Sequence, residues 1–402
     1  MTRALVVIDG EHYPPVVRDA IQELPYEVIG AWLAGGTEKL HGEIEYGVPL
    51  LEELDDGFAD AEVVVDMSDE PVLGPRERML LASRVLAAGL RYEGADFQFS
   101  APAYASFPLP SLAVIGTGKR VGKTAVTGHV ARLLAQDRDV VVVAMGRGGP
   151  AEPQVAVVQP TLSALLDLSR AGHHAASDYL ETAALTGVVT IGCRRAGGGL
   201  AGAVTTSNVL RGAALAAERE PDVVVFDGSG AAIPPIDVDA RILVSGRGHD
   251  PLAYLNPYRV LVSDLVVLVG GGDVGAIREL KKIPILEADL RLRPVSPLQG
   301  RRVAVFTTGP APTDHLDAEV VSVSRNLANR AALSEDLERI DADVYLVEIK
   351  AAGIDVVADT ARERGAEVVF ADNQPVSLPG EPDLEAELRS LVEAALKEPA
   401  VA

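Results

Sequence analysis

One segment constrains the fold of this chain more than any other: AVIGTGKRVGKTAV, residues 113–126. It runs from consecutive apolar residues through a glycine-rich turn to a Gly-Lys-Thr triplet. In a strand–turn–helix of this kind, successive backbone N–H groups and the N-terminus of the helix surround phosphate oxygens. The segment therefore predicts a buried strand at 112–115, a phosphate loop, and a helix at 123–135.

The loop follows the G-x-x-x-x-G-K-[ST] pattern with one departure, because position 117 is threonine and the glycine stands one residue earlier. We expect Lys123 on the β- and γ-phosphates and the Thr124 hydroxyl on a magnesium ion. ATP is favoured over GTP, since the sequence has no guanine-reading N-K-x-D motif. The alternative interpretation is a glycine-rich turn that binds no nucleotide. The expected nucleotide contacts are Gly116, Thr117, Gly118, Lys119, Arg120, Val121, Gly122, Lys123, Thr124 and Ala125.

A second oxygen ligand for the metal is expected from DVVVFDGSG, residues 222–230. The apolar run predicts a strand, and Asp227 stands where that strand ends. An acid at the carboxyl end of a parallel strand lies on the same sheet edge as the phosphate loop. We therefore assign Asp227 as a magnesium ligand acting through water, since magnesium usually keeps several waters. The alternative is an ordinary aspartate that caps a helix.

Short runs rich in Val, Ile and Leu recur along the chain, each followed by a glycine-rich turn and a longer amphipathic segment. Continuous apolar strands predict a mostly parallel sheet covered by helices on both faces, which is an α/β architecture. Only 4% of the residues are aromatic, so the cores must be aliphatic. We divide the chain into an N-terminal α/β domain (1–108), a phosphate-loop ATP-binding core (109–298) and a C-terminal α/β domain (299–402). The N-terminal domain is expected to contact substrate or to act as a lid.

The expected elements are as follows. Strands are predicted at 4–8, 27–33, 62–65, 112–115, 140–144, 188–191, 223–226, 242–244, 266–269, 303–306, 344–347 and 368–370. Helices are predicted at 16–23, 76–88, 123–135, 326–338, 354–364 and 384–397, and an extended linker at 100–110.

Charge and composition exclude several classes of protein. The 36 Lys and Arg stand against 58 Asp and Glu, and this net charge of −22 argues against partners such as nucleic acid or an anionic membrane surface. Hydrophobic residues make up 48% of the chain, which is enough for packed cores. The single cysteine, Cys193, excludes an internal disulfide framework and fits a reducing cytosol. We expect a cytoplasmic protein, because no apolar run approaches the ~18 residues of a membrane span.

Basic residues nevertheless collect in glycine-rich turns at predicted strand ends. Glycine leaves room for a ligand to approach, and arginine binds phosphate through two parallel hydrogen bonds. In a parallel sheet all these turns lie on the edge that carries the phosphate loop. We therefore expect a second phosphate-bearing ligand beside ATP, although any one arginine has the alternative of a surface position or a salt bridge. The residues are Lys119, Arg120, Arg147, Arg194, Arg195 and Arg247.

Other polar residues near strand ends are weaker candidates. Asp9, Glu11 and His12 directly follow the first strand and suggest contact with a ligand; the alternative is a capped turn. Two further pairs are the adjacent His173 and His174, of which we favour one near the site, and Asp178 and Glu181, for which a solvated helix face is favoured. The remaining candidates are His249, Asp250, Arg325, Asn326, Arg330 and Lys350.

Together these motifs resemble the cyclic 2,3-diphosphoglycerate synthetase family over most of the chain. The stretches that carry the resemblance are IGTGKRVGKTA, AMGRGGPAEP, ASDYLETAALTGVVTIGCRRAGGGLAG, VFDGSGAAIPP, YLVEIKAAGIDVV and the opening VVIDGEHYPPVV. The loop GT-x-x-x-VGKT is also similar to that of dethiobiotin synthetase. The resemblance implies a three-layer phosphate-loop NTPase core and an ATP-dependent synthetase. This enzyme would close a phosphoanhydride between the 2- and 3-phosphates of 2,3-bisphosphoglycerate, with release of ADP and orthophosphate.

Resemblance and local chemistry together suggest roles. Lys119 and Lys123 are expected to stabilise charge on the γ-phosphoryl group, with Arg147 and Arg195 as further catalytic residues. Two alternatives stay open: an ATP-dependent ligase acting on a carboxylate, and a nucleotide-gated switch or metallochaperone. We expect a homodimer with a small-molecule substrate. The predicted substrate-binding residues are Arg147, Arg194, Arg195, Arg247, Asp9, Glu11 and His12.

Overall fold

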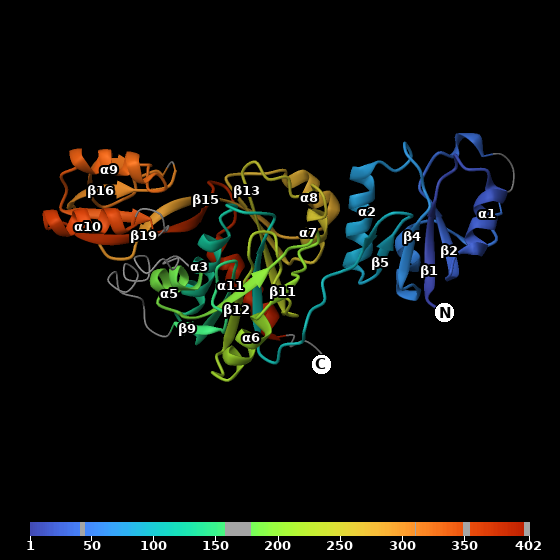
Figure 1. Ribbon diagram of the computed structural model, residues 1–402, viewed down its shortest axis with the longest axis horizontal. Helices are drawn as coiled ribbons and strands as arrows, with labels where there is room; N and C mark the ends of the chain where they lie inside the picture. Colours follow the sequence, from blue (N-terminus) through green and yellow to red (C-terminus); the bar gives the residue numbers. More distant parts are fainter. Residues whose placement is uncertain (41–44, 157–177, 310, 349–353, 398–402) are drawn as a thin grey trace.

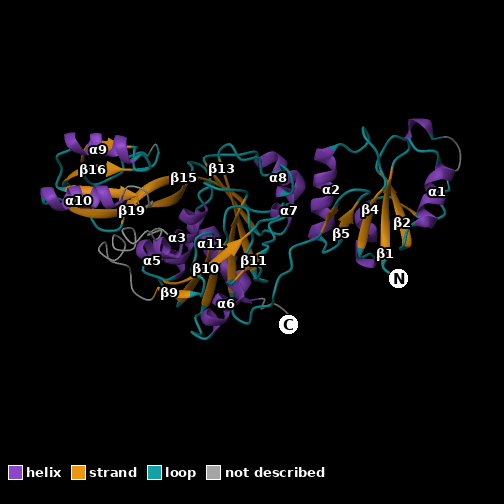
Figure 2. Ribbon diagram, in the orientation of Figure 1, coloured by secondary structure: helices purple, strands orange, loops and turns teal. Residues whose placement is uncertain are grey.

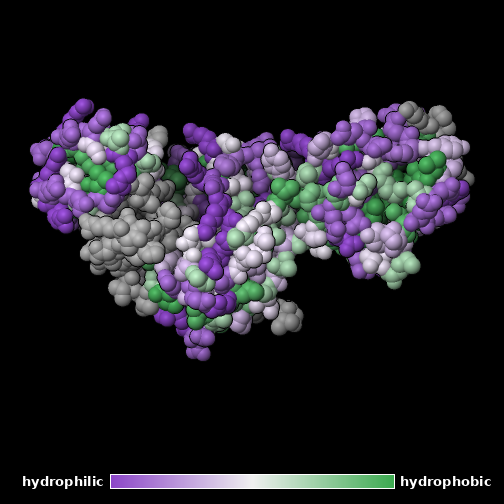
Figure 3. Space-filling model, viewed as in Figure 1, coloured by the Kyte–Doolittle hydropathy of each residue, from purple (hydrophilic) through white to green (hydrophobic). Residues whose placement is uncertain are grey.

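The computed structural model describes residues 1–40, 45–156, 178–309, 311–348 and 354–397. Three units follow one another along the long axis of the molecule: the N-terminal unit, the phosphate-loop core and the C-terminal unit (Figure 1). Each unit has strands packed between helices (Figure 2). The face drawn in Figure 3 is largely hydrophilic, in keeping with a net charge of −22. Within the described ranges, no helix has the length and apolarity needed to cross a bilayer.

The N-terminal unit is a sheet with a helix on each face. Its elements are β1 (Arg3–Ile8), α1 (Pro14–Glu23), β2 (Glu27–Leu33), η1 (Thr37–Lys39), β3 (Leu50–Leu51), η2 (Leu54–Asp60), β4 (Val63–Asp66), α2 (Pro75–Ala87), β5 (Arg91–Glu93) and β6 (Gln98–Phe99). The strand order is β3-β2-β1-β4-β5-β6, and β1 pairs in parallel with β2 and β4. Successive side chains of β1 point to opposite faces. Val6 and Ile8 therefore pack with α1, and Leu5 and Val7 share a core with α2.

The core is a parallel sheet with the phosphate-loop strand near its middle. Its elements are β7 (Ser111–Gly116), α3 (Lys123–Leu134), β8 (Val140–Gly146), β9 (Gln154–Ala156), α5 (Asp178–Thr186), β10 (Val189–Ala196), β11 (Thr206–Ser207), α6 (Val209–Ala217), β12 (Val223–Asp227), β13 (Ala240–Gly246), α7 (Asn256–Leu261), β14 (Leu265–Val269), α8 (Val274–Leu280) and β15 (Ile285–Pro294). The strand order is β11-β10-β8-β12-β7-β13-β14-β15, parallel from β10 to β15. The loops that leave the carboxyl ends of β7, β8, β10, β12 and β13 therefore share one edge.

The C-terminal unit extends the same sheet. Its elements are β16 (Arg302–Phe306), β17 (Glu319–Ser324), α9 (Arg330–Arg339), β18 (Val344–Glu348), α10 (Ile354–Arg364), β19 (Glu367–Ser377) and α11 (Leu384–Lys397). β19 pairs antiparallel with β15 of the core and parallel with β18, so the order continues as β15-β19-β18-β16-β17. β19 thus pairs with one strand of the core and with one strand of the C-terminal unit.

The two faces of the core sheet bury different helices. Leu112 and Val114 of β7 share an aliphatic core with α3 and α11. Ala113 and Ile115, on the other face, share a core with α6, α7 and helix α2 of the N-terminal unit. Each fully buried aliphatic side chain stabilises the fold by roughly 1.5–3 kcal/mol. The continuous apolar runs therefore give a strand that is covered on both sides.

The predicted α/β class and the parallel sheets are confirmed. The predicted helix start at 326 is wrong: α9 begins four residues later, because the Asn329 side chain accepts a hydrogen bond from the backbone N–H of Ala332 and caps the helix there. β15 and β17 were not predicted, because their alternating or exposed residues give no continuous apolar run. The division at 108/109 and 298/299 stays a prediction. Helix α11, placed in the third domain, packs on α3 and β13 of the core.

Candidate active site

The phosphate loop connects β7 to α3, as the sequence predicts. Gly122 precedes the helix in the left-handed region, at φ 91°. A Cβ atom there would come within 3.0 Å of the Val269 side chain, so only glycine fits. Thr117, the departure from the usual pattern, is buried; its hydroxyl lies 3.1 Å from that of Ser245, and its backbone N–H donates to the Val244 carbonyl. The threonine thus ties the loop to β13.

A buried ion pair joins the start of α3 to the end of β12. The Lys123 ammonium contacts Oδ1 of Asp227, and the Thr127 hydroxyl donates to the same oxygen at 2.8 Å. Asp227 is only 1% exposed. Its second oxygen, Oδ2, is buried with no hydrogen-bond partner among the described residues. An unpartnered carboxylate oxygen at this position suits a cation.

These residues fit a magnesium ion bound together with a nucleotide. Oxygen ligands are what magnesium requires, and it usually takes few of them from the protein. Thr124 and Asp227 lie on the two elements that the Lys123 pair joins, and Thr124 lines the adjacent cleft. In the described part of the chain, no three His, Cys, Asp or Glu residues group to form a metal site of their own. The remaining ligands would therefore be the nucleotide and water.

A cavity of about 770 Å³ opens over the phosphate loop and is closed on its far side by the C-terminal unit. The core contributes the loop, the turns after β8 and β12, and Glu181 and Leu185 of α5. Its lining residues from β15 and the C-terminal unit are Leu290, Thr308, Ala328, Glu348, Ala371, Asp372 and Asn373. A second cavity of about 500 Å³, between 291–298 and 315–317, contains no predicted site residue.

Three of the predicted basic residues converge on Gly230, in the turn after β12. A Cβ atom on Gly230 would lie 2.9 Å from Nη2 of Arg147, 3.6 Å from Cγ of Lys119 and 3.8 Å from Nη2 of Arg195. We call Lys119, Arg147 and Arg195 the basic cluster. Lys119, Arg147 and Gly230 also line the cavity, whereas Arg195 is buried behind its lining. Positive charge is therefore concentrated beside the phosphate loop, within a protein whose net charge is −22.

Two other predicted arginines lie elsewhere. Arg194 and Arg195 are neighbours on β10, so their side chains point to opposite faces; Arg195 is buried and Arg194 is exposed. Arg247 donates from Nε to the carbonyl of Gly270 at 3.1 Å, in the turn after β14. Neither Arg194 nor Arg247 lines the cavity. Their predicted contact with substrate stays a prediction that the cluster does not support.

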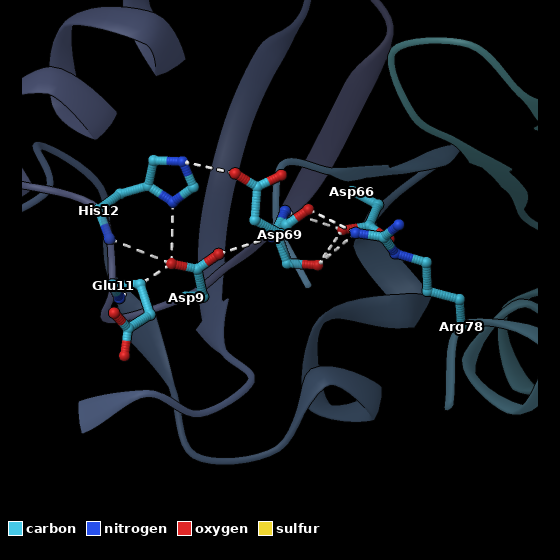
Figure 4. A network of polar contacts seen from close by, with 7 residues as sticks. Asp9, Glu11, His12, Asp66, Asp69 and Arg78 are labelled. Carbon is cyan, nitrogen blue, oxygen red and sulfur yellow. Dashed lines mark hydrogen bonds and ion pairs between the residues drawn. The ribbon is translucent and has the colours of Figure 1, made fainter. Parts of the chain in front are cut away.

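The N-terminal candidates form a network of their own (Figure 4). Oδ1 of Asp9 accepts hydrogen bonds from the backbone N–H groups of Glu11 and His12, and Nδ1 of His12 lies 2.8 Å from it. Oδ2 accepts from the backbone N–H of Asp69. Burial raises the pKa of Asp9, but these hydrogen bonds outweigh it and hold the pKa below its ordinary value. Asp9, Glu11 and His12 do not line the cavity, so a substrate role for them stays a prediction.

The weaker candidates lie at different places in the structure. His249 lies against the phosphate loop, where a Cβ atom on Gly118 would come within 2.7 Å of its Cε1. Arg330 pairs with Asp355, and Asn326 donates to Asp336, so both hold the C-terminal unit together. Asp250 and Arg325 lie outside the cavity lining, and Asp178 is the first residue of α5. His173, His174 and Lys350 lie outside the described residues.

Sequence reasoning missed the wall contributed by the C-terminal unit. Glu348 ends β18 and is buried; its Oε2 accepts from the backbone N–H and the hydroxyl of Thr308, both at 2.9 Å. Its Oε1 accepts from the Asn373 amide at 2.7 Å. The only signal was a carboxylate at the end of a predicted strand. That signal does not say which strand faces the phosphate loop.

The chain is similar to known proteins over most of its length. The cyclic 2,3-diphosphoglycerate synthetase N-terminal domain matches residues 3–100, its P-loop domain 111–288, and its C-terminal domain 294–374. The cyclic 2,3-diphosphoglycerate synthetase of Rubrobacter xylanophilus is 48% identical over 93% of this chain and 94% of its own. That of Thermococcus kodakarensis is 41% identical over 94% and 95%. Among solved structures, LpxK of Aquifex aeolicus in complex with ATP is 16% identical, with a TM-score of 0.43 over 73% of this chain and 90% of its own.

Proposed function

This chain belongs to the cyclic 2,3-diphosphoglycerate synthetase family, and we propose that it uses ATP to close 2,3-bisphosphoglycerate into its cyclic phosphoanhydride. ADP and orthophosphate are the other products. One observation carries the proposal: Lys119, Arg147 and Arg195 gather around Gly230, directly beside a phosphate loop. Two polyanions that react with each other need such a concentration of positive charge, because their mutual repulsion must be overcome.

The nucleotide would bind along the loop from Gly116 to Ala125. Backbone N–H groups at the start of α3 cradle its phosphates, and Lys123 leaves Asp227 to reach the β- and γ-phosphates. Thr124 and Asp227 would hold the magnesium ion, whose positive charge offsets the charge that develops on the phosphates. This assignment is supported by Oδ2 of Asp227, which has no hydrogen-bond partner in the part of the chain that the structure describes.

The substrate would lie between the nucleotide and the basic cluster. An oxygen of one substrate phosphate attacks the γ-phosphorus of ATP, and the bond to ADP breaks. The product is a mixed anhydride, in which the substrate carries a pyrophosphoryl group. An oxygen of the neighbouring phosphate then attacks the inner phosphorus of that group and expels orthophosphate, which closes the ring. Both nucleophiles are already ionised, so the chemistry requires positioning rather than a strong general base.

The wall formed by the C-terminal unit suits a reaction that must exclude water, because an anhydride is lost by hydrolysis. Glu348 fixes Thr308 and Asn373, which face the phosphate loop across the cavity. Arg132 of α3 and Arg293 of β15 both pair with Asp372, beside Asn373 on β19. These ion pairs anchor the wall to the helix that begins at the phosphate loop. The expected homodimer and cytoplasmic location stay predictions.

Phosphorus NMR tests the proposal. The protein is incubated with ATP, magnesium and 2,3-bisphosphoglycerate, and we expect one cyclic phosphoanhydride and one orthophosphate for each ATP consumed. Phosphate release without bisphosphoglycerate should be slow. Stimulation by a carboxylate substrate instead would select a dethiobiotin-synthetase-like ligase. Slow hydrolysis that no small molecule stimulates would select a nucleotide-gated switch, and either result would overturn the proposal.

A further inference from the structure

Arg259 is a buried charge that the proposed reaction does not use. It lies on α7 and is 1% exposed, yet all of its hydrogen bonds with the described residues go to neutral oxygens. Burial lowers the pKa of Arg259 to about 10. Taking a guanidinium out of water without a carboxylate partner is costly. An apolar residue would fill this position without that desolvation penalty. The presence of an arginine therefore points to a role for its hydrogen bonds.

Those bonds join two loops, of which the one after β12 lines the active-site cavity. We call residues 197–203 the β10 loop and residues 228–232 the β12 loop, after the strands that they follow. Arg259 donates to the Ala231 carbonyl from Nε at 3.0 Å and from Nη2 at 2.6 Å. From Nη1 it donates to the Leu200 carbonyl at 3.0 Å. One side chain thus bridges a carbonyl of each loop.

Arg195 makes the same kind of bridge from the other side. Its Nη1 donates to the Gly197 carbonyl at 2.6 Å, and its Nη2 donates to the Ser229 carbonyl at 2.7 Å. Two arginines from different elements therefore each join a carbonyl of the β10 loop to a carbonyl of the β12 loop. Gly230 lies between Ser229 and Ala231, whose carbonyls accept these hydrogen bonds. It is the residue around which the basic cluster gathers.

We propose that Arg259 is a positioning residue for phosphoryl transfer. Together with Arg195 it clamps the β10 loop to the β12 loop, and the clamp keeps Gly230 against the basic cluster. The inference rests on the proposed function, because its chemical consequence is the accuracy with which the acceptor phosphate is placed. A guanidinium is suited to this task, since its five N–H groups are held in one plane and can donate to several carbonyls at once.

The position of α7 extends the consequence to the N-terminal unit. α7 packs on α2, and Tyr258 shares a core with Leu81 and Val85 of that helix. The helix that carries Arg259 is therefore packed against the N-terminal unit. In this arrangement the N-terminal unit supports the active site through α2, α7 and Arg259, while Asp9 and His12 bond within their own unit.

Arg259→Lys tests the clamp, because it keeps the charge and loses the fork. We expect on the order of 10-fold less cyclic product for each orthophosphate released, since a misplaced acceptor lets water compete. The KM for ATP should stay within about twofold, because the phosphate loop is untouched. Tyr258→Phe is the matched control: it removes a partly buried hydrogen bond between the same helix and Tyr104, and it should leave the ratio unchanged. A wild-type ratio in Arg259→Lys would overturn the proposal.

A second variant and a second measurement cover other outcomes. If Arg259→Lys does not fold, Asn256→Ala replaces it, because the Asn256 side chain accepts from Nη1 at 3.1 Å and steadies the guanidinium. Asn256→Ala should lower the ratio of cyclic product to orthophosphate by less than Arg259→Lys does. An unchanged ratio would overturn the clamp. Hydrogen exchange is independent of the reaction. Exchange should rise in both loops of Arg259→Lys and not in the phosphate loop; unchanged exchange would also overturn the clamp. Wild-type protein that makes no cyclic product would overturn the proposed function alone.

Discussion

Acid should weaken the core through one histidine on the phosphate-loop helix. His129 of α3 is 4% exposed, and its Nε2 is buried with no hydrogen-bond partner among the described residues. Burial, together with the positive charges of Arg132 and Arg293, lowers the pKa of His129 from 6.5 to about 4. Glu385 of α11 lies 3.7 Å from Nε2, but it is half exposed. In the folded protein the ring is therefore neutral at pH 7.

The size of the effect follows from the difference in pKa. Between pH 6.5 and pH 4 the unfolded chain binds a proton at this ring and the folded protein does not. The free energy of unfolding therefore falls as the pH falls through this window. The contribution is about 2 kcal/mol between pH 7 and pH 5, and it approaches about 3 kcal/mol at the acid end. Leu in place of His129 removes the proton while keeping an apolar side chain in the α3 core.

Urea unfolding of the wild type and His129→Leu, followed by circular dichroism at pH 7 and pH 5, measures the difference. All other titrating groups are common to both proteins, so their contributions cancel. We expect the wild type to lose about 2 kcal/mol more than the variant on acidification. Titration of the imidazole proton resonances should independently give a His129 midpoint near pH 4. Equal losses in the two proteins, or a midpoint near 6.5, would refute the reasoning.

Two further predictions concern the site. Lys123→Ala should abolish turnover and lower the free energy of unfolding by about 3 kcal/mol, because buried Asp227 loses its cation. Adding Asp227→Asn should restore stability without turnover, and near-normal turnover of Lys123→Ala would exclude its assigned role. Arg147→Ala should raise the KM for 2,3-bisphosphoglycerate on the order of 10-fold and leave that for ATP unchanged. Arg211→Ala, which removes an exposed pair with Glu152, is the control; an equal effect would place the second anion elsewhere.

Local sequence patterns predict local structure well in this chain. The apolar run before Thr117 and the Gly-Lys-Thr after it are enough to predict a strand, a loop and a helix, because each is decided by neighbouring residues. β15 shows the limit. Its charged residues alternate with apolar ones, as in a strand with one covered face, and only its pairing with β19 reveals it. Long-range pairing also decides where α11 packs, since an amphipathic helix specifies its buried face and not its partner.

The same distinction applies to the site. The order of strands places Lys119, Arg147 and Arg195 together, and a parallel sheet was enough to predict that edge. Strand alternation separates Arg194 from Arg195, which neighbouring glycines alone do not indicate. The role of Arg259 cannot be predicted from the sequence, because the segment that contains it, NPYRVL, is that of an ordinary short helix. Its significance lies in which carbonyls it meets, and those belong to loops 28 and 59 residues away.

Several basic side chains of the site and its wall have partners within the protein. Lys123 pairs with Asp227, Arg132 pairs with Asp372, and Arg195 donates to two backbone carbonyls. A chain with a negative net charge can therefore hold these basic side chains in position before any ligand binds. In the proposed reaction ATP replaces Asp227 as the partner of Lys123, while the bonds of Arg132 and Arg195 need not break. The groups that change partners are thus those at the phosphate loop, and the groups that keep them hold the walls in place.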